Sequence, residues 1–480
     1  MKNYVTVKMV VVVLILFLFS TSGLLSSSES LSSSSHQVYG IGEIDRHGRV
    51  TGAMGGTELM VEALKARLPG VLKRSVQISV SRVREVEKGK RRHILWLHDL
   101  PEDPESQHLK DKKSRDRFDV IVFVSEYQKR RYEKYFGVKF TNSVVLRNAI
   151  VPFSHKDIQK NKDGPLKLIY HTTPHRGLSI LMLVFAELYK KYPKRIHLDV
   201  YSSFEIYGWK QRDKPFEALF DQCREHPGCK YHGFVSNKKI RGALREAHIF
   251  AYPSIWEETS CIAAIEAMSA GCEIVTSSLG ALPETLGEYG IKYRHDSKDL
   301  EQNAIRFMNA MDVAIRTYWF HEAINRRRKM SLYAAREFGW GFPGWPEGRT
   351  EQWIRLLSSQ ISEFDVLPQR DEFNSDKKYS EALFVSGKRR EMAGEIDKAV
   401  LIYEKSLQFR PRSSLLAVNL GIMKIRAGES MGHQELSLRG MKRLESVIEK
   451  GSSFRPLPRR RGGSIVRYGI AIRGVFWYVM

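Results

Sequence analysis

Two acidic residues, Glu258 and Glu266, are the strongest chemical signal in the sequence. They lie in the run Pro253 to Met268, which follows a strand-like apolar segment and continues into an apolar, helix-like one. This pattern places Glu258 in a strand-to-helix loop and Glu266 about two turns into the helix. The free N–H groups and the positive dipole end of such a helix suit a pyrophosphate.

The residues around Glu266 argue against a plain surface role for this carboxylate. The alternative is an exposed acidic cap at Glu258 and a surface helix position at Glu266. However, Ile262 to Met268 are apolar or small apart from Glu266 itself, which indicates a largely buried helix. Because a buried carboxylate needs a polar partner, hydroxyls of a sugar or ribose would satisfy it.

At these residues the chain resembles the family-four retaining glycosyltransferases (glycosyl transferases group 1), whose hallmark is glutamate, seven residues, glutamate. The resemblance covers about residues 38–353. It implies that Glu258 is catalytic and contacts hydroxyls of the donor sugar, and that Glu266 binds the ribose of the donor nucleotide. Thr259, Ser260 and Cys261 are expected to bind the donor, although the family's usual Phe-Gly is here Ser260-Cys261.

A basic residue in the loop His171 to Leu178 is placed to neutralise donor phosphates. The family's usual lysine is Arg176 here, and its usual earlier arginine is missing, with Tyr170 near that place. Arginine binds phosphate through two parallel hydrogen bonds, so we expect Arg176 to bind the donor. The alternative is a loop arginine in solvent.

Four further positions resemble the family's motifs. Gly56, in the Gly-Gly-x-Glu-like loop before a helix, is expected to face the donor phosphates and the acceptor. His98 ends a strand and is expected near the reacting sugar as a second catalytic residue, with a structural histidine as the alternative. Gly233 and Gly280 are expected to bind the donor, the first near the base, although each also reads as an ordinary turn.

Strand-like and helix-like segments alternate around these residues, which predicts two parallel sheets covered by helices. Three strands are expected at residues 76–80, 94–97 and 120–124, and four more at residues 166–170, 196–201, 249–252 and 273–276. The predicted fold class is therefore α/β of the GT-B type. It comprises two doubly wound Rossmann-like domains facing a cleft, followed by a small α-helical repeat region.

Domain boundaries follow from changes in composition. We expect a signal anchor or signal peptide plus a Ser-rich stem at residues 1–35, an acceptor domain at 36–150 and a donor domain at 151–340. A back-crossing helix at 341–365, tetratricopeptide-like repeats at 376–435 and a basic tail at 436–480 should follow. Gly387 and Gly421 are 34 residues apart, which is the tetratricopeptide spacing. Two repeats are too few to stand alone, so we expect them to pack against the donor domain.

The first residues predict a targeting element. Lys2 and Lys8 precede an apolar run that reaches Leu25 and only just qualifies as a bilayer span of roughly 17 to 25 residues. A Ser-rich stretch follows as a flexible stem. We expect a single-pass type II membrane protein of the Golgi or ER with a lumenal body; the alternative is a secreted or lumenal protein after signal cleavage.

Composition excludes several other classes of protein. The net charge of +23 is spread over scattered basic runs without a nucleic-acid fold signature, so no nucleic-acid partner is expected. The four cysteines lack paired C-x-x-C spacing, which disfavours structural zinc. Cys223 and Cys229 are spaced so that they could pair in an oxidising lumen, whereas Cys261 and Cys272 are expected to be buried and free.

The predicted function is a retaining, metal-independent glycosyltransferase. It would take a UDP- or GDP-linked sugar as donor, a glycan, lipid or protein-linked acceptor, and neither metal nor cofactor, because no Asp-x-Asp ends an apolar strand. The alternative is a membrane-tethered interaction protein whose repeats bind a protein partner and whose transferase half is inactive. An epimerase or phosphorylase of the same fold is a further rival.

Overall fold

The computed structural model describes residues 55–479, apart from gaps at 82–91, 155, 157, 159, 342–347, 360–367, 432–433, 451–453, 457–467 and 473–474. The predicted targeting segment and stem lie outside the described residues. None of the described helices is both long and apolar enough to cross a bilayer. The chain divides into two compact units, which we call the four-stranded unit (Gly56–Ile158 and Leu332–Met480) and the six-stranded unit (Gln159–Ser331).

The four-stranded unit contains a parallel sheet in the order β1-β2-β3-β4. Its strands are β1 (Val76–Val80), β2 (Arg92–Leu97), β3 (Val120–Phe123) and β4 (Ser143–Val145). The helices around it are α2 (Gly56–Arg67), α3 (Gly70–Ser75), η1 (Pro104–Lys110), α4 (Lys112–Arg115) and α5 (Glu126–Phe136). Nine buried residues, Phe123 and Tyr132 among them, form an apolar core cluster here, because apolar side chains of the strands meet those of the helices.

The six-stranded unit contains a second parallel sheet in the order β10-β9-β8-β5-β6-β7. Its strands are β5 (Leu166–Tyr170), β6 (Ile196–Val200), β7 (Cys229–Tyr231), β8 (Ile249–Tyr252), β9 (Glu273–Ser277) and β10 (Ile291–Tyr293). β5 and β8 are neighbours at the point where the strand order reverses. Ligands of open α/β sheets bind at such a switch point, beyond the carboxyl ends of the strands.

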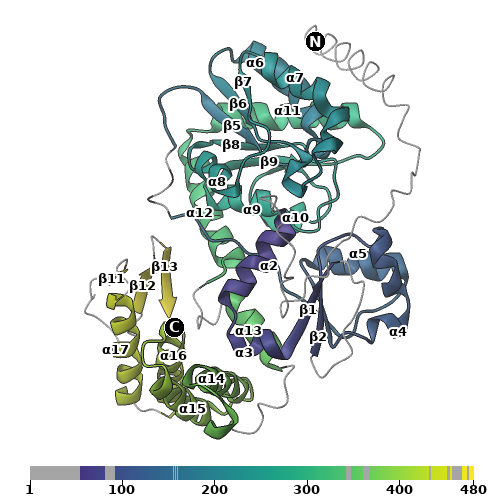
Figure 1. The fold of residues 1–480 in the computed structure, drawn as a ribbon. Helices are drawn as coiled ribbons and strands as arrows, with labels where there is room; N and C mark the ends of the chain where they lie inside the picture. The colour runs from purple at the N-terminus through teal and green to yellow at the C-terminus, as the bar shows by residue number, and fades with distance from the viewer. Residues whose placement is uncertain are drawn as a thin grey trace. The chain divides into compact units, whose positions relative to one another are not determined.

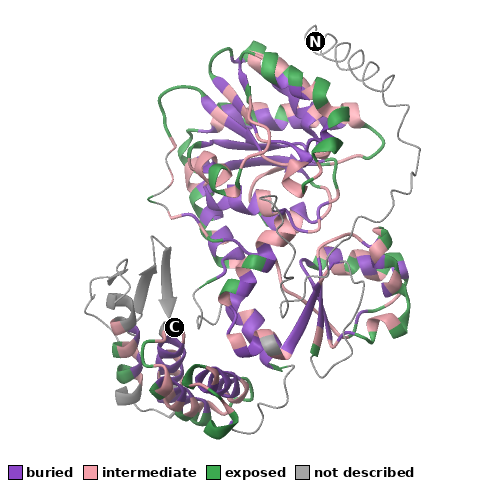
Figure 2. Cartoon of the chain, in the orientation of Figure 1, coloured by how far each residue is buried: buried purple, intermediate pink, exposed green. Residues whose placement is uncertain are grey.

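Helices cover both faces of the second sheet (Figure 1). One face carries α6 (Leu178–Lys191), α7 (Glu217–Glu225) and α11 (Leu300–Thr317), and the other α8 (Asn237–Glu246), α9 (Ile262–Ser269), α10 (Leu282–Leu286) and the start of α12 (His321–Phe338). Short 3-10 turns are η3 (Pro174–Arg176), η4 (Phe204–Tyr207) and η5 (Lys210–Phe216). The central strands are buried between the two helical layers (Figure 2).

The predicted fold class is confirmed as α/β, with two parallel sheets and a helical C-terminal region. The seven predicted strands are all present, with ends that agree to within two residues. Within the two parallel sheets, three short strands, β4, β7 and β10, were not predicted. Each has only three residues, which is too short to show an apolar pattern in the sequence.

The C-terminal helices belong to the four-stranded unit. They are α13 (Arg349–Ser359), η7 (Arg370–Glu372), α14 (Asp376–Met392), α15 (Ile396–Phe409), α16 (Ser414–Met431) and α17 (Gln434–Lys450). Helix α17 runs to residue 450, so helical structure extends beyond the predicted boundary at 435. A small antiparallel sheet follows, with strands β11 (Phe454–Pro456), β12 (Tyr468–Ile472) and β13 (Val475–Val479).

The repeats attach to other parts of the four-stranded unit, whereas we expected them to pack against the donor domain. Helix α14 contacts α3 and α13, and Glu381 of α14 accepts a hydrogen bond from the backbone N–H of Val71 at 3.1 Å. Buried Lys388 of α14 also forms an ion pair with Glu351 of α13. These polar anchors could not be inferred from the 34-residue period. The tetratricopeptide class of the helices remains a prediction.

The cysteines are all buried free thiols. The predicted burial of Cys261 and Cys272 is confirmed. Cys223 of α7 and Cys229 of β7 lie within hydrogen-bonding reach of each other, and this contact, together with burial, raises the pKa of the Cys229 thiol.

Candidate functional site

Glu258 lies in the loop that joins β8 to α9, as predicted. Its residue is 5% exposed, and its carboxylate Oε1 accepts two hydrogen bonds. The Tyr252 hydroxyl donates at 2.5 Å, and Nη1 of Arg176 donates at 2.7 Å. Burial and the nearby Glu258 carboxylate raise the pKa of Tyr252 well above its usual value, so the phenol keeps the proton that it donates. The Glu258 side chain is therefore fixed in one orientation.

Arg176 reaches Glu258 from the loop that follows β5. Because β5 and β8 are adjacent, their carboxyl-end loops meet at the same edge of the sheet. Burial disfavours the charge of the guanidinium, but the Glu258 carboxylate outweighs this effect and raises the pKa of Arg176 well above its usual value. The guanidinium also lies over the ring of Trp256 at 5.6 Å. Arg176 is thus a fixed, permanent cation, and not the solvent-exposed loop residue of the alternative.

The loop that carries Arg176 presents buried polar atoms that have no partner among the described residues. They are Nε of Arg176, Nδ1 of His175, Oγ1 of Thr173 and Nε2 of His171. Buried polar atoms in proteins are nearly always hydrogen-bonded, so these atoms are available to water or to a ligand. Burial and the neighbouring Arg176 and Arg212 lower the pKa of His175 to about 4, so its ring is neutral near pH 7.

Glu266 is the fifth residue of α9 and 7% exposed. The helix begins at Ile262, so Glu266 lies little more than one turn from its start, not the two turns that we predicted. Burial of this carboxylate is confirmed. Its oxygens are held by two residues of α8, with Nη1 of Arg241 at 2.7 Å and Nδ2 of Asn237 at 3.4 Å.

Sequence reasoning missed Arg241 and Asn237. The prediction assigned the partner of Glu266 to ligand hydroxyls, whereas the protein itself supplies an arginine and an amide. A signal was present, because the two residues are four apart on the predicted helix after Gly233 and so share one face. Nothing in the sequence indicated that this face meets α9.

Two glycines allow the loops of this site to approach closely. Gly177 has φ +122°, and a Cβ atom built there would lie 2.1 Å from the carbonyl oxygen of Pro253 in the β8–α9 loop. Gly280 has φ +63°, and its Cβ would lie 2.6 Å from the backbone nitrogen of Glu258. The neighbouring Ala281 N–H donates to the Glu258 carbonyl at 2.7 Å. Because it lacks a side chain, Gly280 lets its loop pack directly against the backbone of Glu258.

The remaining predicted residues of the six-stranded unit surround these two pairs. Thr259 is partly exposed, Ser260 is 9% exposed, and Cys261 is the buried N-cap residue of α9. Burial and the Glu258 carboxylate raise the pKa of the Cys261 thiol well above its usual value, so it is neutral. Gly233, with φ +63°, lies in the turn that leads into α8 and hence to Arg241.

A cavity of 460 Å³ lies beside the Gly233 turn, between α8 and the sheet. Tyr201 and His232 stack in its wall with ring centroids 4.2 Å apart, and His232 contacts Asp199 at 2.7 Å. Its lining contains Val235 of the predicted base-contacting loop, but neither of the two glutamates nor Arg176. Sequence reasoning did not find this cavity.

His98 and Gly56 belong to the four-stranded unit. His98 follows β2, donates its backbone N–H to Oγ of Ser81 at 3.0 Å, and packs its ring against Trp96. Desolvation by the surrounding protein lowers the pKa of His98 to about 3, so the imidazole is neutral near pH 7. Gly56 is the first residue of α2. The structure thus brings together Glu258, Arg176 and Gly280 in one unit and places these two residues in the other.

Within the described residues, no group of three His, Cys, Asp or Glu side chains is arranged to hold a metal ion. Metal independence itself remains a prediction. The positive charges that contact the two buried glutamates are Arg176 and Arg241, so each of these cations is already paired.

Part of the six-stranded unit matches a known protein family. Residues 169–310 match the family model described as Glycosyl transferases group 1. The six-stranded unit therefore carries a group 1 glycosyltransferase domain. All predicted donor-binding residues except Gly56 lie within that match.

Two curated proteins resemble part of this chain, and both are subunits of phosphatidylinositol N-acetylglucosaminyltransferases. The human one is 26% identical over 146 residues, which cover 30% of this chain and 28% of that protein. The gpi3 protein of Schizosaccharomyces pombe is 22% identical over 187 residues, which cover 38% of this chain and 39% of that protein. Each is one subunit of its enzyme. The chain thus spans well under half the length of either relative.

Solved glycosyltransferase structures are more distant. A glycosyltransferase from Rickettsia africae has 11% identity and a TM-score of 0.47, covering 66% of this chain and 83% of that one. Sucrose-phosphate synthase from Thermosynechococcus elongatus has 15% identity and a TM-score of 0.44, covering 57% and 69%.

Proposed function

We propose that this chain is a retaining, metal-independent glycosyltransferase that moves a sugar from a UDP- or GDP-linked donor to a glycan, lipid or protein-linked acceptor. The observation that carries the proposal is the pair of buried glutamates on one strand-to-helix connection, each held by an arginine from another element. A structural role alone would not require two such pairs at the switch point of the sheet, where ligands of this fold class bind.

Arg176 is proposed to stabilise the departing nucleoside diphosphate. When the bond between the sugar C1 and the phosphate oxygen breaks, negative charge develops on that phosphate. Arg176 is held in place by Glu258 and Trp256, and its buried Nε–H has no acceptor among the described residues. A preorganised cation with a spare donor needs little rearrangement to bind the leaving group.

Glu258 is proposed to accept hydrogen bonds from hydroxyls of the donor sugar, and Glu266 from the ribose. Both carboxylates are buried and oriented by protein donors, which suits positioning of a substrate. In the retaining reaction, the acceptor oxygen bonds to C1 on the face that the phosphate leaves. The acceptor proton passes to the departing phosphate oxygen. His98, neutral near pH 7, is proposed as a catalytic residue near the reacting sugar, and Gly56 as a residue that faces the donor phosphates and the acceptor.

The names of the relatives suggest which substrates to test first. Both are subunits of phosphatidylinositol N-acetylglucosaminyltransferases. We therefore propose nucleotide-linked N-acetylglucosamine as the first donor to test and phosphatidylinositol as the first acceptor. Since both relatives are subunits, protein partners of this chain are also part of the proposal. The N-terminal segment is proposed to anchor the protein with its body in the ER or Golgi lumen, which protease protection in sealed microsomes tests.

One observation favours the alternative, an interaction protein with an inactive transferase domain. Tyr170 stands near the family's usual first arginine, and its hydroxyl donates to the Thr173 carbonyl at 2.9 Å, so it shapes the loop and adds no positive charge. Incubation of the full-length chain with a panel of nucleotide sugars and acceptors, followed by mass spectrometry, separates the two functions. Anomeric analysis of the product by NMR tests retention. Absence of transfer and of donor hydrolysis across the panel would favour the alternative.

A further inference from the structure

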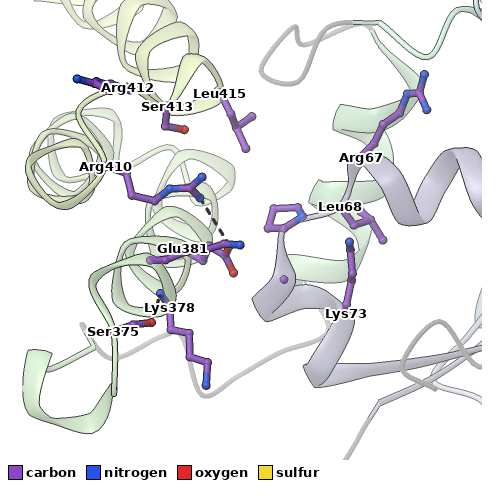
Figure 3. A pocket seen from close by; sticks show the side chains of 13 residues that line it. Arg67, Leu68, Lys73, Ser375, Lys378, Glu381, Arg410, Arg412, Ser413 and Leu415 are labelled. Atoms are coloured by element: carbon purple, nitrogen blue, oxygen red, sulfur yellow. Dashed lines mark hydrogen bonds and ion pairs between the residues drawn. The ribbon is translucent and has the colours of Figure 1, made fainter. Parts of the chain in front are cut away.

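A cavity of 540 Å³ in the four-stranded unit lies outside the glycosyltransferase domain. Its lining comes from three parts of the chain: the α2–α3 segment, the start of α14, and the turn between α15 and α16 (Figure 3). A volume of several hundred Å³ is typical of sites for small ligands. The repeat helices and the N-terminal helices therefore enclose a space that neither set forms alone.

The lining of this cavity is strongly positive. Its charged residues are six cations and one carboxylate, namely Arg67, Lys73, Lys377, Lys378, Arg410, Arg412 and Glu381. Glu381 is already engaged, since its Oε2 accepts from the Val71 N–H and its Oε1 lies 3.6 Å from Nη1 of Arg410. The carboxylate is thus used in holding the cavity together and neutralises at most one of the cations.

Five of the six cations have no acidic partner in the part of the chain that the structure describes, since only Arg410 is paired. They are Arg67, Lys73, Lys377, Lys378 and Arg412. Like charges brought together in one concavity repel each other, which costs stability unless an anion binds there. Three of the lining side chains, those of Lys73, Lys378 and Arg410, are drawn around the same space in Figure 3.

Two long helices also begin at this cavity. Ser375, the N-cap residue of α14, and Ser413, which precedes α16, both line it. The Ser413 hydroxyl accepts from the Leu416 N–H at 3.4 Å. The amino ends of two helices add partial positive charge and N–H donors to the field of the lysines and arginines, and this combination favours phosphate groups.

We propose that this cavity binds a small ligand that carries two or more phosphate groups. Six cations from separate elements exceed what one phosphate can contact, and the volume accommodates a phosphorylated ring or chain. Binding would join α3, α14 and the α15–α16 turn, and so stabilise the position of the repeats within their unit. The phosphates can belong to a soluble phosphate ester or to a lipid head group.

Calorimetry with inositol hexakisphosphate as the probe tests the site in the full-length chain. The triple variant Lys73→Ala/Lys378→Ala/Arg412→Ala removes one cation from each of the three elements. We expect its dissociation constant to rise about tenfold, because each lost charged contact weakens binding severalfold or less. The matched control Lys113→Ala/Arg130→Ala/Lys134→Ala removes three cations of α4 and α5 in the same unit and should bind the probe as the wild type does.

Equal weakening in the two triple variants would show that the probe senses only net charge and would overturn the proposal, as would failure of the wild type to bind. If the cavity variant loses its fold, the single variant Arg412→Ala, at an exposed residue, should still weaken binding measurably. Vesicles containing phosphatidylinositol bisphosphate distinguish the sources. Cavity-dependent vesicle binding indicates a lipid head group, and binding of the free probe alone indicates a soluble ligand.

Discussion

Glu258 and Glu266 are each oriented by an arginine that comes from a different element of the six-stranded unit. The sequence predicted the buried state of Glu266, because apolar neighbours on every side leave no polar face for it. It also pointed to Arg176 as a cation of the donor site, although not to its contact with Glu258. It could not predict that Tyr252, the last residue of β8, donates to the same carboxylate oxygen, since tyrosine at a strand end is ordinary in an apolar strand.

Tyr252→Phe should lower kcat/KM about tenfold to a hundredfold while leaving the chain folded, because a buried hydrogen bond to a charged group contributes roughly 1.5 to 3 kcal/mol. Steady-state kinetics with the preferred donor measures this. Tyr293→Phe is the matched control, since the Tyr293 hydroxyl is buried in the same unit without a partner among the described residues. Equal activity of the two variants would mean that Tyr252 does not position Glu258.

Arg241→Ala should raise the KM for the donor about tenfold with a smaller effect on kcat, because Glu266, the proposed ribose ligand, loses the charged group that orients its carboxylate. Lys238→Ala removes an exposed cation from the same helix and should leave the KM unchanged. The proposed role of Glu266 requires the two variants to differ. A normal donor KM in Arg241→Ala would contradict it.

At the scale of elements, the site depends on the close approach of the loops after β5 and β8. The alternating pattern predicted both strands, and the switch of strand order between them explains why Arg176 and Glu258 meet. What the sequence could not show is how near the loops come. Gly177 looks like an ordinary turn glycine, yet only the absence of a side chain permits its contact with Pro253.

Gly177→Ala should reduce the free energy of unfolding by about 3 kcal/mol or more, because the added methyl group meets a backbone oxygen at a left-handed φ. Urea unfolding followed by circular dichroism measures the change. Gly208→Ala is the control, as its φ is +73° but nothing lies within 4 Å of the added carbon, so strain alone should cost about 1 kcal/mol. Similar losses in both variants would show that the loop contact is not tight.

At the scale of the whole molecule, some of the many basic residues are gathered around one cavity. From the sequence, the basic runs were interpreted as scattered surface charge. For most of these runs, no contact in the described residues contradicts this interpretation. The cavity that contains Lys73 and Arg412 gathers cations from segments more than 300 residues apart, which no local pattern could reveal. Long-range contacts of this kind, such as the attachment of α14 to α3, could not be predicted, because they join residues that are far apart in the sequence.

Stability should fall as the pH drops from about 6.5 toward 4, because several histidines are held neutral. Burial lowers the pKa of His248 to about 4, and its Nδ1 accepts from the Lys167 N–H at 2.9 Å. The unfolded chain takes up a proton near pH 6.5, whereas the folded chain resists until about pH 4, so protonation favours unfolding between these values. At pH 5 this costs about 2 kcal/mol for one such histidine.

Urea unfolding at pH 7.5 and pH 5 checks this expectation. His248→Gln removes the titrating group, so the variant should lose less stability than the wild type between the two pH values, even though it starts less stable. An equal loss in both proteins would show that His248 is not held neutral by the fold.

The most direct test of the central claim is the release of nucleoside diphosphate from nucleotide-sugar donors by the full-length chain and by its Glu258→Gln variant. The substitution keeps the size of the side chain and one acceptor oxygen, but it replaces the other oxygen with an NH2 donor and removes the charge that pairs with Arg176. We predict release by the wild type with at least one donor, and a rate about a hundredfold lower in the variant, which loses stability with the buried ion pair but stays folded by circular dichroism. Equal rates in the two proteins, or no release from any donor, would contradict a glycosyl-transfer site built around Glu258.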